Sequence, residues 1–374
     1  MNPEGDIVVR LARRDQRVRD VGVASSRTGL PPHLVRGKPA VDVRRLIPLL
    51  FSICSRAQGA AAAAAISAAQ GVPAVPAETA RQELEVMLET LQETIWRLLI
   101  DWPRTMGEAS QVPPVALVRR AADAVTDNGV TLDAMLAVVD MVLLEHVYGD
   151  RPDAWLGNTD LQAYDQWVES ASTLPARLLR RLRDEAPGLG RSDVALMPDA
   201  TLENLVRAVI GDLDLDPQFV RTPRWSGRPA ETGALARQQA APLVAQLLAR
   251  EGRTAATRFA ARLVELATIV DQLRSRVTGR LAPVRSHALA FGLGLGLAET
   301  ARGLLLHRAR VEQGLVTDYR IVAPTEWNFH PAGPLAQGLL GRPADDAERL
   351  EREARTVVQS LDPCVSCRVE LADA

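Results

Sequence analysis

Cysteine is scarce in this chain, which holds only three among 374 residues. Such a small, odd number excludes the disulfide framework of small secreted domains and favours a reducing compartment, so we expect a cytoplasmic protein. Long apolar runs are missing as well. None reaches the roughly 18 residues of a membrane span, and we expect no membrane insertion. The first residues, from Met1 to Asp6, lack the basic and apolar regions of a secretory signal.

An excess of charge of one sign is also missing. The chain carries 44 lysines and arginines against 46 aspartates and glutamates, a formal net charge of −2. No basic tract stands out that could follow a phosphate backbone, so we expect no nucleic acid among the partners. Apolar residues make up 47% of the chain, which is long enough to bury a substantial core.

Two of the three cysteines stand close together near the end of the chain, in Asp362-Pro363-Cys364-Val365-Ser366-Cys367. The Cys-x-x-Cys spacing presents two thiols that can share one metal or oxidise to each other. Cys54 lies far upstream, so only the fold can bring all three to one site. The residues alone leave open a metal site, a redox pair, a zinc site completed by histidine or carboxylate, and a buried core cysteine at Cys54.

Hydrophobic periodicity predicts a mainly α protein, a large helical bundle with small β-strand pairs near the N- and C-terminal ends. Helices are expected over residues 78–100, 114–127, 132–144, 161–183, 202–213 and 240–281. Upstream of these, an alanine-rich helix through 60–65 follows a break at Pro48. β-branched runs predict a hairpin within 7–25, and the strand-like segments 304–311 and 318–322 are joined by a turn at Gly314.

We expect one domain over 1–374. It divides into an N-terminal strand region, 1–40, a helical bundle, 41–285, and a C-terminal segment, 286–374, which holds the strand pair and the cysteine pair. No internal repeat is evident that would indicate a repeat architecture.

Several unrelated blocks of this sequence resemble, in the same order, those of [NiFe]-hydrogenase large subunits. The blocks are Arg36-Gly37, Ile53-Cys54, the segment 223–237, Arg302-Gly303, Pro324-Thr325-Glu326-Trp327-Asn328 and Asp362-Pro363-Cys364-x-x-Cys367. The resemblance covers most of the chain and implies the helical bundle of that family.

In that family four cysteine thiolates hold nickel, and two of them bridge to an iron that bears cyanide and carbon monoxide. Thiolates suit this task because soft sulfur binds nickel and low-spin iron well. The resemblance implies that Cys54 and Cys364 are terminal metal ligands and that Cys367 is a bridging one. It also implies that Arg302 packs over the diatomic ligands of the iron.

The chain departs from the family pattern at positions that matter for catalysis. Ala57 stands where the second bridging cysteine is expected, and Pro39 stands in place of a glutamate implicated in proton transfer. Gln58 replaces a histidine that follows the first cysteine pair. Glu370 replaces the histidine after which the family loses a C-terminal tail, so we expect no such processing. His307, although it lies in a matching block, is expected to be structural.

With these departures the chain resembles the HupK-type hydrogenase accessory proteins, also through its segment 96–103, Trp-Arg-Leu-Leu-Ile-Asp-Trp-Pro. The resemblance implies a non-catalytic scaffold for [NiFe] hydrogenase maturation that transiently carries an iron–dicyanide–carbonyl unit, with nickel as a second candidate cargo. The implied partners are a small hydrogenase maturation chaperone and the immature hydrogenase large subunit. Two alternatives stay open: a divergent catalytic large subunit, and a structural partner that binds no metal.

A missing bridge gives a physical reason for transient binding, because a scaffold must release what it holds. Our hypothesis is that Cys367 anchors the iron unit while Arg302 donates to a cyanide nitrogen. Asp362 precedes Pro363, so its backbone is expected to be extended and to fix the approach of the cysteine pair. A cysteine restored at Ala57 should tighten metal retention.

Overall fold

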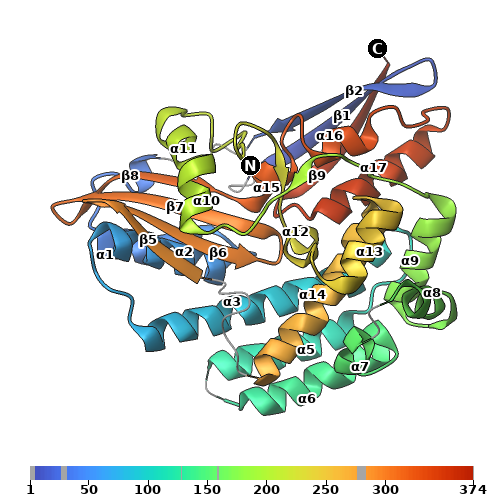
Figure 1. Cartoon of the computed structure of the whole chain (residues 1–374), viewed down its shortest axis with the longest axis horizontal. Coiled ribbons are helices and arrows are strands. Elements are labelled where there is room, and N and C mark those ends of the chain that lie inside the picture. Colours follow the sequence, from blue (N-terminus) through green and yellow to red (C-terminus); the bar gives the residue numbers. More distant parts are fainter. Residues whose placement is uncertain (1–4, 27–31, 128, 158–159, 276–283, 374) are drawn as a thin grey trace.

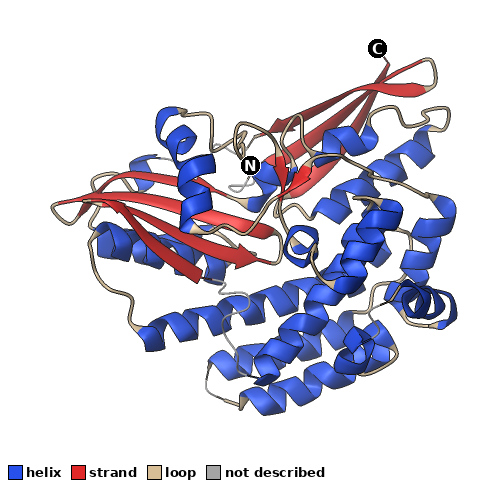
Figure 2. Cartoon of the chain, viewed as in Figure 1, coloured by secondary structure: helices blue, strands red, loops and turns tan. Residues whose placement is uncertain are grey.

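The computed structural model describes residues 5–26, 32–127, 129–157, 160–275 and 284–373. Helices make up most of the chain, and its strands gather mainly in two sheets that lie apart from each other (Figure 2). In Figure 1 the sheet of β5–β8 covers α2 on one side of the molecule, while β1, β2 and β9 lie near both chain ends.

The α-helices have the following bounds: α1 Ala40–Leu46, α2 Ser55–Ala69, α3 Pro76–Trp96, α4 Trp102–Thr105, α5 Val112–Thr126, α6 Leu132–Leu143, α7 Pro152–Gly157, α8 Leu161–Ser170, α9 Leu174–Glu185, α10 Leu202–Leu205, α11 Gly211–Leu215, α12 Ala234–Gln238, α13 Pro242–Glu251, α14 Ala255–Ser275, α15 Pro324–Asn328, α16 Pro334–Leu339 and α17 Ala347–Leu361. Short 3₁₀ or π turns are η1 Pro32–Leu34, η2 Ile47–Leu50, η3 Arg97–Asp101, η4 Leu144–Tyr148 and η5 Val206–Ile210. The strands are β1 Asp6–Arg14, β2 Arg17–Ser25, β3 Ala195–Leu196, β4 Ala230–Glu231, β5 Val284–Ala290, β6 Leu293–Thr300, β7 Gly303–Glu312, β8 Leu315–Val322 and β9 Ser366–Asp373.

The predicted N-terminal hairpin is confirmed as β1 and β2, which pair antiparallel. Asp15 and Gln16 both have positive φ, 52° and 55°, as a two-residue turn matched to strand twist requires. The end of the chain then adds a third strand, because β9 runs parallel to β1 with Cys367 opposite Ile7. No strand was predicted there, although Cys367, Val369 and Leu371 alternate with polar residues in the pattern of a strand.

The predicted C-terminal strand pair is confirmed as β7 and β8, joined at Gln313 and Gly314 with φ of 49° and 79°. It is only half of a four-stranded antiparallel sheet of order β5-β6-β7-β8 that begins at Val284. The prediction of a strand pair alone was therefore wrong. Strand β6 was not predicted because it contains Gly294 and Gly296, and glycine is depleted in strands. Strand β5, its partner in the sheet, was not predicted either.

Those glycines let the alanine-rich helix α2 lie directly on the sheet (Figure 1). A Cβ added at Gly296 would lie 2.0 Å from the carbonyl oxygen of Ala61, and one at Gly294 would lie 2.1 Å from that of Ala65. The predicted alanine-rich helix is confirmed as α2. Small side chains on both surfaces bring the two backbones into contact.

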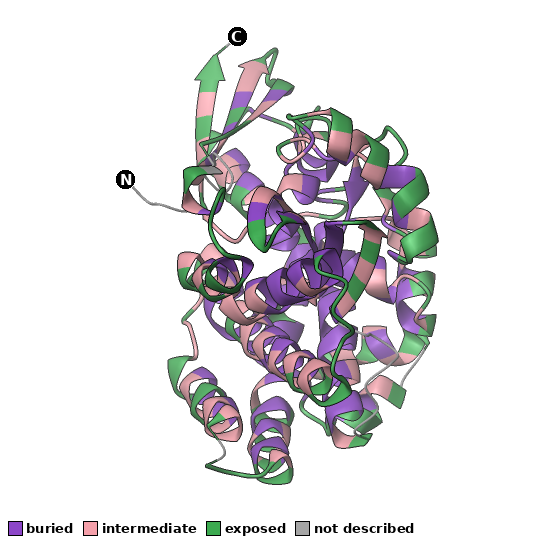
Figure 3. Ribbon diagram, turned by 90° about the vertical axis from the view of Figure 1, so that its left-hand side faces the viewer, coloured by how far each residue is buried: buried purple, intermediate pink, exposed green. Residues whose placement is uncertain are grey.

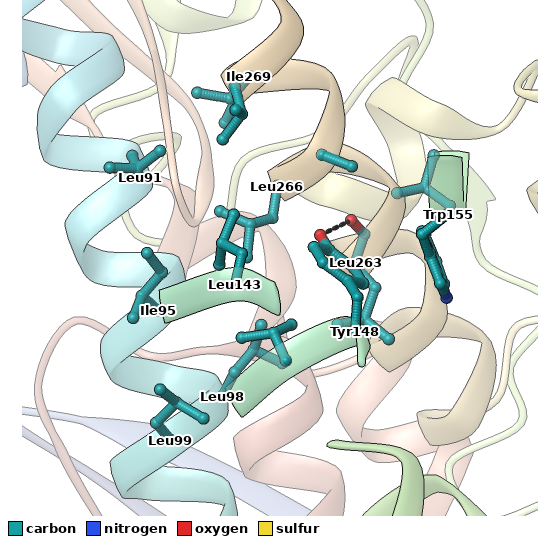
Figure 4. Packing of buried hydrophobic residues seen from close by; sticks show 14 of the residues in the cluster. Leu91, Ile95, Leu98, Leu99, Leu143, Tyr148, Trp155, Leu263, Leu266 and Ile269 are labelled. Atoms are coloured by element: carbon teal, nitrogen blue, oxygen red, sulfur yellow. Dashed lines mark hydrogen bonds between the residues drawn. The ribbon is translucent and has the colours of Figure 1, made fainter. Parts of the chain in front are cut away.

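The helical body is built around α14, of which most residues are buried. Figure 3 shows buried residues gathered along such inner helices, and Figure 4 shows side chains of α3 and α14 packed together. In this core the Tyr148 hydroxyl donates to the Leu263 carbonyl at 2.8 Å. Within the described ranges, no helix has both the length and the apolar composition needed to cross a bilayer.

Two long helices predicted from the sequence are each divided in the structure. The segment 161–183 forms α8 and α9, because Leu174-Pro175 starts a new helix. The segment 240–281 forms α13 and α14, separated at Gly252, whose φ is 70°. The predicted end of the second helix, 276–281, lies outside the described residues.

Candidate metal-binding site

Cys54 stands at the N-cap of α2, where the chain leaves the 3₁₀ turn around Pro48. Its sulfur accepts a hydrogen bond from Gln58 Nε2 at 3.7 Å, one turn along the helix. The first backbone N–H groups of α2 are taken by a carboxylate of α3: Arg56 and Ala57 donate to Glu89 at 2.9 and 3.2 Å. Glu89 therefore caps the helix beside Cys54.

Cys364 follows α17 and is held by a threonine of α15. The Cys364 backbone N–H donates to Thr325 Oγ1 at 3.2 Å, and the same hydroxyl donates to the Cys364 sulfur at 3.1 Å. One side chain therefore orients both the backbone and the thiol of this residue. Sequence analysis missed this role, although Thr325 lies in one of the blocks that matched.

Arg302 lies in the tight turn between β6 and β7 and is 3% exposed. Its guanidinium pairs with Glu93 of α3 at 2.8 Å and with Asp362 at 3.4 Å. It also interacts electrostatically with the thiols of Cys54 and Cys364, which interact with each other. The fold thus brings together three of the four predicted site residues.

The electrostatics of this site keep Cys54 protonated. Burial raises the pKa of its thiol far above the ordinary value, and negative charge on Cys364 and Glu89 raises it further. Arg302 and the Gln58 hydrogen bond act in the opposite direction, with smaller effects. Burial also raises the pKa of Glu89 to about 7, against its two backbone hydrogen bonds. A metal ion that binds here has to displace the proton of Cys54.

Asp362 does not have the extended backbone that was predicted from the proline after it. Its φ and ψ are 54° and 69°, the left-handed conformation, and its N–H caps α17 by donating to Val358 and Gln359 carbonyls. The prediction was wrong because tertiary contacts outweigh the local preference. The Asp362 carboxylate is 2% exposed, and its nearest cation is Arg97, at 2.7 Å.

Cys367 has other described neighbours than Cys54 and Cys364 have. It belongs to β9, beside Ile7 of β1, and lines a cavity of about 520 Å³ together with Arg97, Arg104 and other residues. Burial raises the pKa of its thiol to about 12. Among the described residues, no three His, Cys, Asp or Glu side chains are grouped so as to hold a metal ion. Our hypothesis of a joint iron site of Cys367 and Arg302 stays a prediction.

A buried polar chain extends from Cys54 into the sheet. Gln58, which donates to the cysteine, accepts from His307 Nε2 at 2.9 Å, and His307 Nδ1 lies 2.8 Å from the Tyr319 hydroxyl. Burial lowers the pKa of His307 to about 3, so the ring is neutral. His307 thus orients Gln58, which agrees with its predicted structural role.

The other departures from the family pattern lie outside this cluster. Pro39 stands before α1 and forms an isolated bridge with Leu315 at the start of β8. Glu370 lies on β9 and pairs with Arg10 of β1 at 3.0 Å. Its side chain helps to fasten the last strand.

The donors of the cluster fit a soft, anionic metal unit. Cys54 and Cys364 supply two sulfurs, and Arg302 supplies positive charge and N–H groups in a buried setting. Ala57, fully buried, offers only a methyl group on the same helical turn. Two thiols with one cation can hold such a unit, but they cannot reproduce the four-thiolate site implied for the enzymes.

Known proteins share both the sequence and the fold of this chain. Residues 212–370 match the family model described as nickel-dependent hydrogenase. The hydrogenase expression/formation protein HoxV of Cupriavidus necator is 31% identical, over 94% of this chain and 93% of its own. HupK of Azotobacter vinelandii, with the same description, is 32% identical over 99% of both chains. The chain belongs to the HupK/HoxV family of hydrogenase expression/formation proteins.

Solved structures of hydrogenases have the same fold as this chain. A chain of the [NiFeSe]-hydrogenase of Dm. baculatum superimposes on it with a TM-score of 0.59, over 94% of both chains, at 17% identity. At that identity the likeness shows the fold alone. The resemblance to hydrogenase large subunits is confirmed, and so is the likeness to HupK.

Proposed function

We propose that this chain is a non-catalytic accessory protein of [NiFe] hydrogenase maturation that transiently carries an iron–dicyanide–carbonyl unit in the cytoplasm. Its relatives are described as hydrogenase expression/formation proteins, which supports the accessory role. We infer that a small maturation chaperone delivers the unit and that the immature hydrogenase large subunit receives it. Nickel is the second candidate cargo.

The proposal depends on one observation. Two thiols, Cys54 and Cys364, interact with Arg302, whereas an enzyme of this fold is expected to have four metal-binding thiolates. The two thiols also interact with each other. Two metal–sulfur bonds, formed against burial that favours the protonated thiol, bind less tightly than four. Such a site suits a carrier that must release its cargo.

Arg302 supplies the recognition in this proposal. A guanidinium gives charge-assisted hydrogen bonds to anionic acceptors such as cyanide nitrogens, and it stays charged even when buried. Glu93 and Asp362 hold it from two sides. The guanidinium therefore keeps its direction before any cargo arrives, which lowers the entropic cost of binding.

The test is an infrared spectrum of the chain purified without oxygen from cells that express the maturation proteins. We expect cyanide and carbonyl stretches in the parent and their loss in Cys54→Ser and Cys364→Ser. Ser366→Ala, which alters the same C-terminal segment but keeps every thiol, is the matched control. Parent protein without these bands and without bound metal would contradict the proposal and favour a structural partner.

The variant Ala57→Cys tests whether the absence of a bridging cysteine explains transient metal binding. A third sulfur on the first turn of α2 should slow the release of iron to a chelator by at least about tenfold, the equivalent of roughly 1.4 kcal/mol. If the variant holds iron no longer than the parent, the absent cysteine does not explain transient binding. Uptake of hydrogen by the parent would instead favour a divergent catalytic subunit.

A further inference from the structure

The last strand, β9, forms an open edge of its sheet. The order of that sheet is β2-β1-β9, so β1 pairs with only one side of the β9 backbone. Among the described residues, the backbone of Ser366–Asp373 makes no hydrogen bond apart from those with β1. Figure 3 shows the strand that ends at C on the outside of the molecule. Its outward N–H and C=O groups can therefore pair with another strand.

This edge lacks several features by which natural proteins keep edge strands from pairing. β9 contains neither proline nor lysine, and its eight residues keep a regular register with β1, without a bulge. Val369 and Leu371 are only partly buried against the core. Val369 also lines a cavity of about 520 Å³ beside the strand. Apolar surface along the edge thus remains for a neighbouring strand to cover.

The side chains of β9 are complementary to those of a second β9 that runs in the opposite direction. Arg368 and Glu370 lie on the exposed face of the strand, and Val369 lies between them on the other face. If Val369 stands opposite Val369 of the second copy, Arg368 of each copy stands opposite Glu370 of the other. This register forms two pairs of opposite charge, and it places Cys367 opposite Leu371 on the apolar face.

Both charges are available for these pairs. In the part of the chain that the structure describes, Arg368 has no ion-pair partner. Glu370 pairs with Arg10 of β1 at 3.0 Å, yet its side chain is 48% exposed, and a carboxylate can accept from more than one guanidinium. Opposite charges directly across an antiparallel pair stabilise it, whereas like charges destabilise it.

We propose that two copies of this chain associate through β9, antiparallel and with Val369 on the twofold axis. The two three-stranded sheets then form one continuous sheet of order β2-β1-β9-β9-β1-β2. The interface is self-complementary, because the same edge of each copy supplies both the guanidinium and the carboxylate. The inference concerns assembly alone and does not depend on the proposed function.

Sedimentation equilibrium of the purified full chain tests the dimer. We expect the parent to dimerise at micromolar concentration, with affinity at least about tenfold weaker in Arg368→Glu and in Glu370→Arg, because each variant places like charges opposite one another. The double variant Arg368→Glu/Glu370→Arg exchanges the two charges and should restore the dimer. Arg19→Glu, at an exposed position on β2 of the same sheet, is the matched control. A monomeric parent, single variants that associate like the parent, or a double variant no better than the singles would overturn the interface.

Hydrogen–deuterium exchange of the parent locates the contact without any substitution. Amides of residues 366–373 that point away from β1 should exchange more slowly as the protein concentration rises through the range of dimerisation. Amides of β5, an edge strand of the other sheet, serve as the internal control and should not change. Protection that grows with concentration elsewhere, and not in β9, would place the dimer contact on another surface and overturn the proposal.

Discussion

Arg97 Nε lies 2.7 Å from Asp362 Oδ1, and this buried pair connects the π turn η3 with the residue that leads into Cys364. Arg302 and Arg262 approach the same carboxylate at 3.4 and 3.3 Å. Three guanidinium groups therefore share one anion in the core. Asp362 stabilises the position of Arg302 as well as the C-terminal end of α17.

Replacement of Asp362 by asparagine should destabilise the fold strongly. It removes the anion that three guanidinium groups share. Arg97 and Arg302 keep Asp101 and Glu93, but Arg262 keeps no other ion-pair partner among the described residues. Removal of one partner from a buried ionic group costs about 3–5 kcal/mol. Urea unfolding of Asp362→Asn measures this. Asp345→Asn breaks an exposed pair with Arg349, and it should cost less than about 1 kcal/mol. Equal losses in both variants would show that Asp362 has no special role.

The Asp362 carboxylate also makes the stability of the fold depend on pH in the acid range. Burial raises the pKa of Asp362, but the three arginines together lower it more, so it lies below the ordinary value of 3.8. As the pH falls, the unfolded chain therefore takes up the proton first. Its contribution is complete above pH 3.8 and is lost as the pH falls through the lower folded pKa. The urea concentration at the unfolding midpoint of the parent should therefore fall below pH 4. The part of this fall that Asp362 causes should be absent in Asp362→Asn.

His307 and Glu89 should influence stability in opposite directions between pH 4.5 and 6.5. The pKa of His307 is lowered from 6.5 to about 3, so stability rises with pH through this window. The pKa of Glu89 is raised from 4.5 to about 7, so stability falls with rising pH there. Each group alone gives a slope of up to about 1.4 kcal/mol per pH unit.

Single variants should separate these two slopes. Relative to the parent, His307→Asn should lose the rise in stability with pH, and Glu89→Gln should lose the fall. Urea midpoints measured from pH 4.5 to 7.5 give both differences, and His33→Gln, at an exposed position, is the control. Parallel pH curves for all four proteins would contradict the assignment.

Close packing of α2 on β6 should make Gly296 intolerant of any side chain. A Cβ there would lie 2.0 Å from the Ala61 carbonyl oxygen, so Gly296→Ala forces two backbones apart. We expect a loss of about 3 kcal/mol in the free energy of unfolding. Gly211→Ala is the control, because no atom lies within 4 Å of its added Cβ in α11. The control should be neutral or slightly stabilising.

Thr325→Val should loosen the backbone at Cys364 without changing the shape of the side chain. The Cys364 N–H loses its acceptor, at a cost of about 1–3 kcal/mol. Hydrogen–deuterium exchange at the Cys364 amide should become faster, while Thr317→Val, at a partly exposed site on β8, should leave it unchanged. Unchanged exchange in Thr325→Val would mean that another group holds this segment.

Much of the fold could be predicted from local sequence patterns. The hairpin of β1 and β2, the turn at Gly314 and the alanine-rich helix α2 could all be predicted, because turn residues and side-chain periods act over a few residues. The family could also be predicted, because several motifs occur in the same order as in hydrogenase large subunits. The strands β5 and β6 could not be predicted, because they are stabilised by packing on α2, which is far away in the sequence.

At the candidate site, the chemical groups follow from the residue types alone: three thiols, the guanidinium of Arg302, and no thiol at position 57. Which of these groups are neighbours depends on tertiary contacts. Cys54 and Cys364 meet beside Arg302 because the start of α2 and the end of α17 come together, while backbone pairing with β1 holds Cys367 in β9. A three-residue spacing cannot specify these neighbours, since strand pairing and ion pairs with distant arginines set where each residue lies.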